Sequence, residues 1–229
     1  MDVKQANPEF YERFEHFAFE EVPDEEAAKL APKTRYFAIL AALMGCGGTD
    51  AFTEMLPAAL GSGVTPVDVM EIVYQGTDYL GYGRMLPFMK AATAVLEARG
   101  VALPLPSQAT TIAENRLEKG VAAQAAIFGE RMNEAWKAGH INRWLADNCF
   151  GDYYTRTGLD LQQREMITFC FLLAQGGCEP QLIAHAKGNM NIGNSKDFLL
   201  RVVAQCLPYV GYPRSLNAIS CVNKAAEQA

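Results

Sequence analysis

An internal repeat is the feature that most constrains how this chain can fold. Residues 79–86 read YLGYGRML and residues 209–216 read YVGYPRSL, so five residues recur at one spacing. The match extends upstream, because residues 63–82 align with residues 193–212 at the same shift of 130. Self-similarity over such a length indicates two copies of one structural module.

A second match locates the two copies more fully. Residues 30–45 align with residues 159–174 at a shift of 129, so one residue was gained or lost at the glycines that follow. The segment VALPLPSQATT at 101–111 is rich in proline and small polar residues, as linkers are. We therefore expect a first repeat over residues 1–105 and a second over residues 106–229.

Each copy has the pattern of α-helices. REMITFCFLLAQ, beginning at Arg164, is apolar nearly all round, which is typical of a buried helix, and the glycines at 176–177 end it. Pro180 suits the first turn of the next helix. Ser195 is a candidate N-cap for a further amphipathic helix, and a last helix is expected from about Arg214. No alternating strand pattern is evident, so the predicted fold class is all-α.

Composition excludes several classes of function. The chain has 229 residues, a net charge of −6 and 50% hydrophobic residues. The negative charge argues against nucleic acid and anionic membranes as partners. The N-terminal sequence has no apolar signal-peptide core, so a cytoplasmic location is the default expectation. The six cysteines form no C-x-x-C pair and the three histidines have no metal-ligand spacing; we expect no metal and no cofactor.

One group of residues in the second copy could carry chemistry. Glu165 lies in an otherwise apolar segment, where a carboxylate must be paired or change its pKa. On the following helix Cys178, Gln181 and His185 fall on one stripe. Cys178 is expected at the positive end of that helix, which lowers a thiol pKa. A histidine and a buried glutamate can donate and accept protons near neutral pH.

Structural roles are also compatible with these residues. A single histidine on an apolar helix is often a hydrogen-bonded core residue, and Glu165 could simply pair with an arginine. The helix spacing places Glu165 and His185 at different levels if their helices run antiparallel. We therefore expect them to meet only across steeply crossed helices, or through a water or a substrate.

Together these motifs resemble the carboxymuconolactone decarboxylase family, which includes AhpD-type alkylhydroperoxidases. The resemblance covers both copies and is stronger from about Gly120 to Ala226. It rests on a Phe-Gly entry, an Arg-x-Gly-Leu-Asp turn, Arg-Glu opening a buried helix, a Gln-Leu-x-x-His helix and an aromatic-Gly-aromatic-Pro break. It implies an AhpD-like helical bundle that assembles as trimers or hexamers. For a duplicated chain it implies a homotrimer that mimics a hexamer.

The resemblance also implies two activities. A decarboxylase would act on a small carboxylated lactone or a related cyclic acid, with His185 as proton donor and Glu165 orienting or recharging it. Arg156 is a candidate for holding a substrate carboxylate. The peroxidase branch needs two cysteines, but Gln181 stands at the second position. A thiol-dependent antioxidant protein using Cys178 with Cys46 is the alternative, and a non-catalytic assembly or ligand-binding module is a third.

The first copy lacks the residues of this group. Tyr36 stands at the position of Glu165, and Met55 at that of His185. We therefore expect the first copy to be a catalytically silent structural half. The repeated Tyr-Gly-Tyr segments are expected to be helix ends with aromatic packing and no chemical role.

Overall fold

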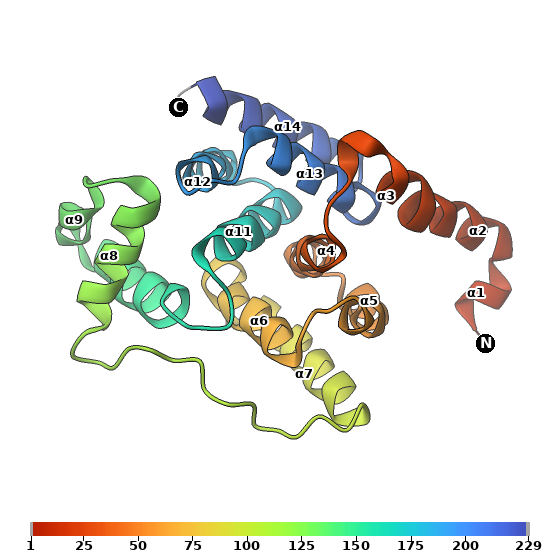
Figure 1. Cartoon of the computed structure of the whole chain (residues 1–229), viewed down its shortest axis with the longest axis horizontal. Helices are drawn as coiled ribbons and strands as arrows, with labels where there is room; N and C mark the ends of the chain where they lie inside the picture. The colour runs from red at the N-terminus through yellow and green to blue at the C-terminus, as the bar shows by residue number, and fades with distance from the viewer. Residues whose placement is uncertain (1, 228–229) are drawn as a thin grey trace.

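The computed structural model describes residues 2–227 as a set of helices without a strand among them (Figure 1). The first half contains α1 (Val3–Ala6), α2 (Pro8–His16), η1 (Phe17–Glu21), α3 (Val22–Asp24), η2 (Glu26–Ala28), α4 (Pro32–Cys46), α5 (Thr49–Gly61), α6 (Pro66–Leu80) and α7 (Tyr82–Ala98). The second contains α8 (Arg116–Phe128), α9 (Met132–Ala135), η3 (Trp136–Ala138), α10 (His140–Trp144), η4 (Leu145–Tyr154), α11 (Leu161–Gln175), α12 (Glu179–Asn191), α13 (Lys196–Val210) and α14 (Tyr212–Glu227).

The helices repeat in the order that the sequence predicts. The run α4, α5, α6, α7 corresponds to α11, α12, α13, α14, and the first three pairs have equal lengths of 15, 13 and 15 residues. The equivalent helices begin 129 or 130 positions apart, as the sequence alignment requires. The all-α tandem repeat is thereby confirmed.

Local sequence explains the helix ends. Asp160 and Gln163 form a reciprocal capping box at the start of α11, and Gly176 ends that helix. Ser195 accepts a hydrogen bond from the Phe198 amide and caps α13, as predicted. The last helix begins earlier than expected, at Tyr212. Gly211 alone forms the break, and Pro213, the second residue of α14, fits the first turn of that helix.

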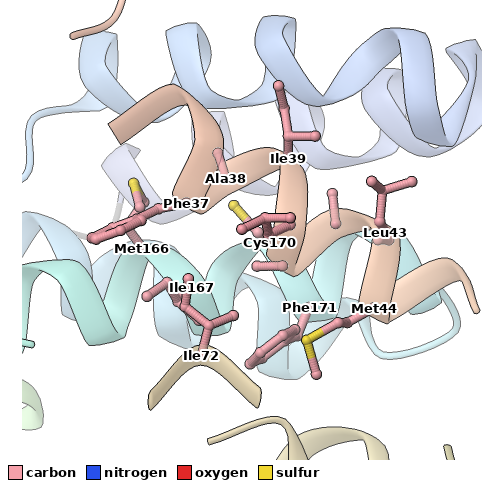
Figure 2. Close-up of a cluster of buried hydrophobic side chains, with 14 of the residues drawn as sticks. Phe37, Ala38, Ile39, Leu43, Met44, Ile72, Met166, Ile167, Cys170 and Phe171 are labelled. Atoms are coloured by element: carbon pink, nitrogen blue, oxygen red, sulfur yellow. The ribbon is translucent and has the colours of Figure 1, made fainter. Parts of the chain in front are cut away.

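The core lies where α4 and α11 pack along each other at the centre of the molecule (Figure 1). Figure 2 shows side chains of α4, among them Phe37 and Met44, facing Cys170 and Phe171 of α11, with Ile72 of α6 below them. All five side chains are essentially buried. Two helices apolar on nearly every face can be covered only by surrounding helices, which fixes α4 and α11 at the centre.

The two repeats are interlocked crosswise. Helix α6 of the first repeat packs on α11 of the second, and α13 of the second packs on α4 of the first. The crossing is fixed by a pair of equivalent hydrogen bonds. Arg164 of α11 donates to Gln75 of α6 at 3.1 Å, and Arg35 of α4 donates to Gln205 of α13 at 2.7 Å. Each repeat therefore completes the core of the other.

Helices α8 and η4 pack closely together beside α12, and η4 leads through a loop into α11. Segment η4 is π-helical, a geometry that turns side chains away from ordinary α-helical directions. Its last residue, Tyr154, is buried against α11. Over residues 2–227, no helix combines the length and the apolar character needed to cross a membrane.

Candidate active site

Glu165 and His185 meet directly. The Nδ1 atom of His185 lies 2.8 Å from Oε2 of Glu165. The two side chains therefore meet without a bridging molecule, and the steep crossing of their helices stays a prediction. The imidazole hydrogen bond uses Nδ1, and no side chain among residues 2–227 hydrogen-bonds to Nε2. Nε2 is thus the ring nitrogen that can face a reactant.

A glycine on α12 allows this contact. A Cβ atom at Gly188 would lie 3.0 Å from Oε2 of Glu165 and 2.8 Å from the ring of Phe128. Only hydrogen at this position lets α12 approach α11 so closely. Asn189, fully buried, then ties the two helices together by donating to the backbone carbonyls of Glu165 and His185 at 3.0 and 2.8 Å.

The other oxygen of Glu165 is held from η4. Tyr154 donates its hydroxyl proton to Oε1 of Glu165 at 2.8 Å. The Tyr154 hydroxyl in turn lies 2.6 Å from that of Thr168 and 2.8 Å from that of Tyr79. Both carboxylate oxygens therefore have partners, as a fully buried charge requires. The arrangement fixes the carboxylate in one orientation.

The imidazole is held between two aromatic rings. Tyr79 and Phe128 both present a perpendicular ring to His185, at centroid distances of 5.5 and 5.3 Å. The His185 side chain remains 12% exposed, whereas that of Glu165 is 0% exposed. The pair therefore has a fully buried carboxylate and an imidazole that keeps a small exposed surface.

A pocket shares Phe128 with the site, although Glu165 and His185 do not line it. It has a volume of about 450 Å³ and is lined by Phe128, Arg131, Pro180, Ile183, Ala184, Lys187 and Asn191. Two of these side chains, Arg131 and Lys187, are cationic, and Phe128 also touches the His185 ring. The pocket is therefore suited to a small anionic molecule close to the imidazole.

The surroundings of Cys178 and Gln181 differ from those expected of a reactive thiol site. Burial raises the pKa of the Cys178 thiol, so the predicted lowering by the helix end is wrong. The thiol donates to the Leu172 carbonyl at 3.4 Å, and Gln181 is exposed. Cys46 likewise donates to a carbonyl of its own repeat, that of Leu43. All six cysteines are free.

Arg156 belongs to a different cluster. Its guanidinium forms a two-pronged ion pair with Glu71 of α6, at 2.8 to 3.0 Å, and lies over the ring of Tyr74. Arg164 pairs with the same carboxylate at 2.9 Å. The structure therefore brings Arg156 to the contact between the repeats, where it lines a separate pocket of about 320 Å³. It makes no contact with Glu165 or His185.

Metal-binding groups do not gather at this site. Across residues 2–227, no three His, Cys, Asp or Glu side chains converge in a way that could hold a metal ion. The Glu165–His185 pair and the side chains around it are the groups that could carry acid–base chemistry.

Several residues of the site were missed by sequence reasoning. Tyr154 and Phe128 carry no signal beyond lying in aromatic segments, and Gly188 reads as an ordinary helix glycine. Tyr79 is predicted to be a helix-end packing residue, yet it hydrogen-bonds to Tyr154 across the two repeats. The only sequence signal for Tyr79 was the repeated motif that begins with it.

Two comparisons with known proteins bear on the family to which this chain belongs. One curated relative, described as a 4-carboxymuconolactone decarboxylase from Acinetobacter baylyi, is 27% identical over 116 residues, covering 44% of this chain and 80% of the relative. The profile of the carboxymuconolactone decarboxylase family matches residues 8–94 and 140–224, one segment in each repeat and well over half of the chain. The chain therefore belongs to the carboxymuconolactone decarboxylase family.

Proposed function

We propose that the protein is a lyase that removes CO₂ from a small carboxylated lactone or a related cyclic acid. The observation that carries this proposal is the 2.8 Å contact between a buried Glu165 and a partly exposed His185 beside a cationic pocket. The name of the relative from Acinetobacter baylyi and the family membership support the same reaction class.

The reaction needs an acid at the right place. When the bond to the substrate carboxylate breaks, CO₂ leaves and its electron pair remains on the ring carbon framework. A proton from Nε2 of His185 then completes the product. Glu165 holds Nδ1–H, which orients the ring and stabilises the imidazolium form that donates the proton. Each turnover consumes one proton.

Substrate binding would use the pocket cations. Arg131 is an exposed residue that lines the pocket, and its planar guanidinium matches a carboxylate. Arg156, the sequence-based candidate for this role, has its guanidinium engaged by Glu71. We therefore favour Arg131 over Arg156 as the residue that orients the substrate.

The test is turnover of 4-carboxymuconolactone, followed by CO₂ release, with the purified chain and its His185→Ala and Glu165→Gln variants. We expect losses of about 100-fold or more in kcat for His185→Ala, with the helical content unchanged. A wild-type chain that releases no CO₂, or a His185→Ala variant with full activity, would refute the proposal.

A matched control lies on the surface. His16 contacts Glu20 through the same two atoms at the same 2.8 Å, but both side chains are more than 60% exposed. His16→Ala should therefore leave kcat and KM unchanged. A comparable loss in this control would show that the effect of His185→Ala is not specific to the site.

A further inference from the structure

A second pocket lies at the junction of the two repeats and shares no residue with the candidate active site. Its volume of about 320 Å³ is within the range of small-molecule sites. Helix α6 of the first repeat contributes Met70 and Tyr74 to its walls, and the segment that joins the repeats contributes Leu105 and Ser107. Arg156 lines it from the loop between η4 and α11. A ligand in this pocket would therefore contact both repeats and their connection.

One wall of the pocket belongs to a cluster whose formal charges do not cancel. Arg156 and Arg164 both pair with Glu71, at 2.8 and 2.9 Å, so two cations share one carboxylate. Glu71 is also the only acidic side chain that lines the pocket in the part of the chain that the structure describes. The Arg156 side chain is 16% exposed, whereas that of Glu71 is 2% exposed. The charge that a ligand meets is therefore positive, and it attracts an anion.

Arg156 keeps donor capacity that the ion pair does not use. Its Nε and Nη2 atoms donate to Glu71 at 2.8 to 3.0 Å. Its Nη1 atom has no acceptor within residues 2–227, and it is not among the buried polar atoms that lack a partner, so solvent reaches it. The N–H groups on Nη1 can therefore bind an anionic oxygen while the contact with Glu71 stays intact.

The other walls of the pocket are mostly apolar. The ring of Tyr74 lies 5.3 Å from the Arg156 guanidinium, and Met70 and Leu105 line the pocket beside it. The polar side chain of Gln108 is already engaged, because it donates to the Pro106 carbonyl at 3.0 Å and accepts from a threonine hydroxyl. A single cation beside aromatic and aliphatic walls suits an anion that carries an apolar body.

We propose that this pocket binds a small organic carboxylate with an apolar or ring-shaped body. Nη1 of Arg156 would hold the carboxylate, and Tyr74 and Leu105 would contact the body of the ligand. Inorganic phosphate fits less well, because it has no apolar surface to bury against these walls. The inference is independent of the proposed function, since it uses neither Glu165 nor His185. A ligand held here would stabilise the fold by joining the segment between the repeats to α6.

The test uses benzoate as the probe and methionine methyl groups as reporters. Met70 lines the pocket, so its ¹³C-labelled methyl signal, assigned with Met70→Leu, reports what binds there. We expect benzoate to shift this signal with half-saturation in the millimolar range, and the signal of Met55 on α5 to stay in place. Benzamide, the neutral analogue of the same shape, and inorganic phosphate should shift the Met70 signal far less. An equal response to either compound would overturn the proposal.

Two arginine variants distinguish this pocket from the one beside Phe128. Arg156→Gln removes the cation of the proposed site, and we expect half-saturation to need about 10-fold more benzoate. Arg131→Gln is the matched control, because it removes a cation of the other pocket, and it should leave the Met70 titration unchanged. If Arg131→Gln weakened the Met70 response as much as Arg156→Gln, the carboxylate would not be held by Arg156.

A third variant tests the pocket without touching the ion pairs. Ser107 is exposed and lines the pocket, so Ser107→Phe would fill part of it; Ser220→Phe, at an exposed position of α14, is the control. We expect Ser107→Phe to lose both the Met70 shift and the rise in melting temperature that benzoate causes, and Ser220→Phe to keep both. An unmoved Met70 signal in the wild-type chain, or the same shift in Ser107→Phe, would overturn the proposal. Neither readout involves lactone turnover.

Discussion

The buried helices α4 and α11 occupy equivalent places in the two repeats and differ in what they carry. Both open with an arginine that donates to a glutamine of the opposite repeat. The next residue is Tyr36 in α4 and Glu165 in α11. The difference shows that the scaffold was kept in both copies while the acid–base pair is present in one.

The two helices that cross from one repeat to the other, α6 and α13, also differ in what they contact. Tyr79 of α6 reaches the site in the second repeat, where it meets His185 and Tyr154. Tyr209 of α13 reaches the equivalent place in the first repeat, where it meets Met55. The same crossing thus delivers a tyrosine to the Glu165–His185 pair on one side and to a methionine on the other.

The largest effect is expected on the free energy of unfolding when the equivalent arginines Arg164 and Arg35 are replaced. Arg164 is fully buried and pairs with the Glu71 carboxylate. Arg35 instead donates to two neutral groups, Gln205 and the Ala18 carbonyl, and forms no ion pair within residues 2–227. We expect Arg164→Met to lower the free energy of unfolding by about 3 kcal/mol or more, because Glu71 loses one of its two cations. Arg35→Met should cost about 1–2 kcal/mol through lost hydrogen bonds.

Urea denaturation followed by circular dichroism measures both values. The prediction concerns the difference between the two variants, since both replace an arginine at an equivalent helix start. Equal losses would mean that the charge of Glu71 is already satisfied by Arg156 and that Arg164 acts only as a hydrogen-bond donor.

A smaller effect is expected where α12 approaches α11. In Gly188→Ala the added methyl would stand within 3.0 Å of Glu165, Phe128 and Ile127. We expect a loss of about 2 kcal/mol in unfolding free energy, despite the better helix propensity of alanine, together with a fall in kcat. The matched control is Gly61→Ala, which ends α5 in the first repeat and has open space around its Cβ position.

Thermal melting and turnover of the lactone check this prediction together. Gly61→Ala should be neutral or slightly stabilising. A Gly188→Ala protein as stable and active as the wild type would mean that α12 can shift without disturbing the contact between Glu165 and His185.

The smallest effect concerns the pH dependence of stability. Asp78 lies beside Cys149, Tyr153 and Asp152, and burial followed by the Asp152 charge raises its pKa from 3.8 to about 7. Between these pH values the folded chain binds more protons than the unfolded one. The contribution of Asp78 to the free energy of unfolding therefore falls as pH rises from about 4 to about 7.

Asp78→Asn removes this titration. We expect the variant to exceed the wild type in unfolding free energy by about 1–2 kcal/mol at pH 8 and to match it at pH 4. Urea titrations at the two pH values give the difference. The exposed Asp24→Asn variant is the control, and a difference for Asp78→Asn that is the same at both pH values would contradict the assigned cause.

Most of the fold could be predicted from the sequence, because the patterns that indicate its helices and their ends are local. The apolar pattern of α11, the glycines after it and the Ser195 cap each act within a few residues, so their consequences can be predicted without knowing the rest. The crosswise packing could not be predicted in this way. It depends on contacts such as Arg164 with Gln75, which join residues 89 positions apart.

Only part of the site could be predicted, because several of its residues reach it through contacts between distant parts of the chain. Glu165 and His185 were found from residue type and spacing. Tyr154 reaches Glu165 from the last position of the π-helical segment η4, and Tyr79 reaches the site because the repeats interlock. Neither feature leaves a local pattern in the sequence. The helix-end effect predicted for Cys178 was outweighed by burial, which depends on neighbours from distant parts of the chain.

The interlocking of the repeats also bears on how such a chain can evolve. Separate subunits with this packing would have to find each other by diffusion, and each would need to keep its own surface for pairing. A covalent tether sets their effective concentration in the millimolar range. Under that condition one copy can lose its acid–base pair freely, but it cannot be deleted, because the other copy would then lose both half its core and Tyr79.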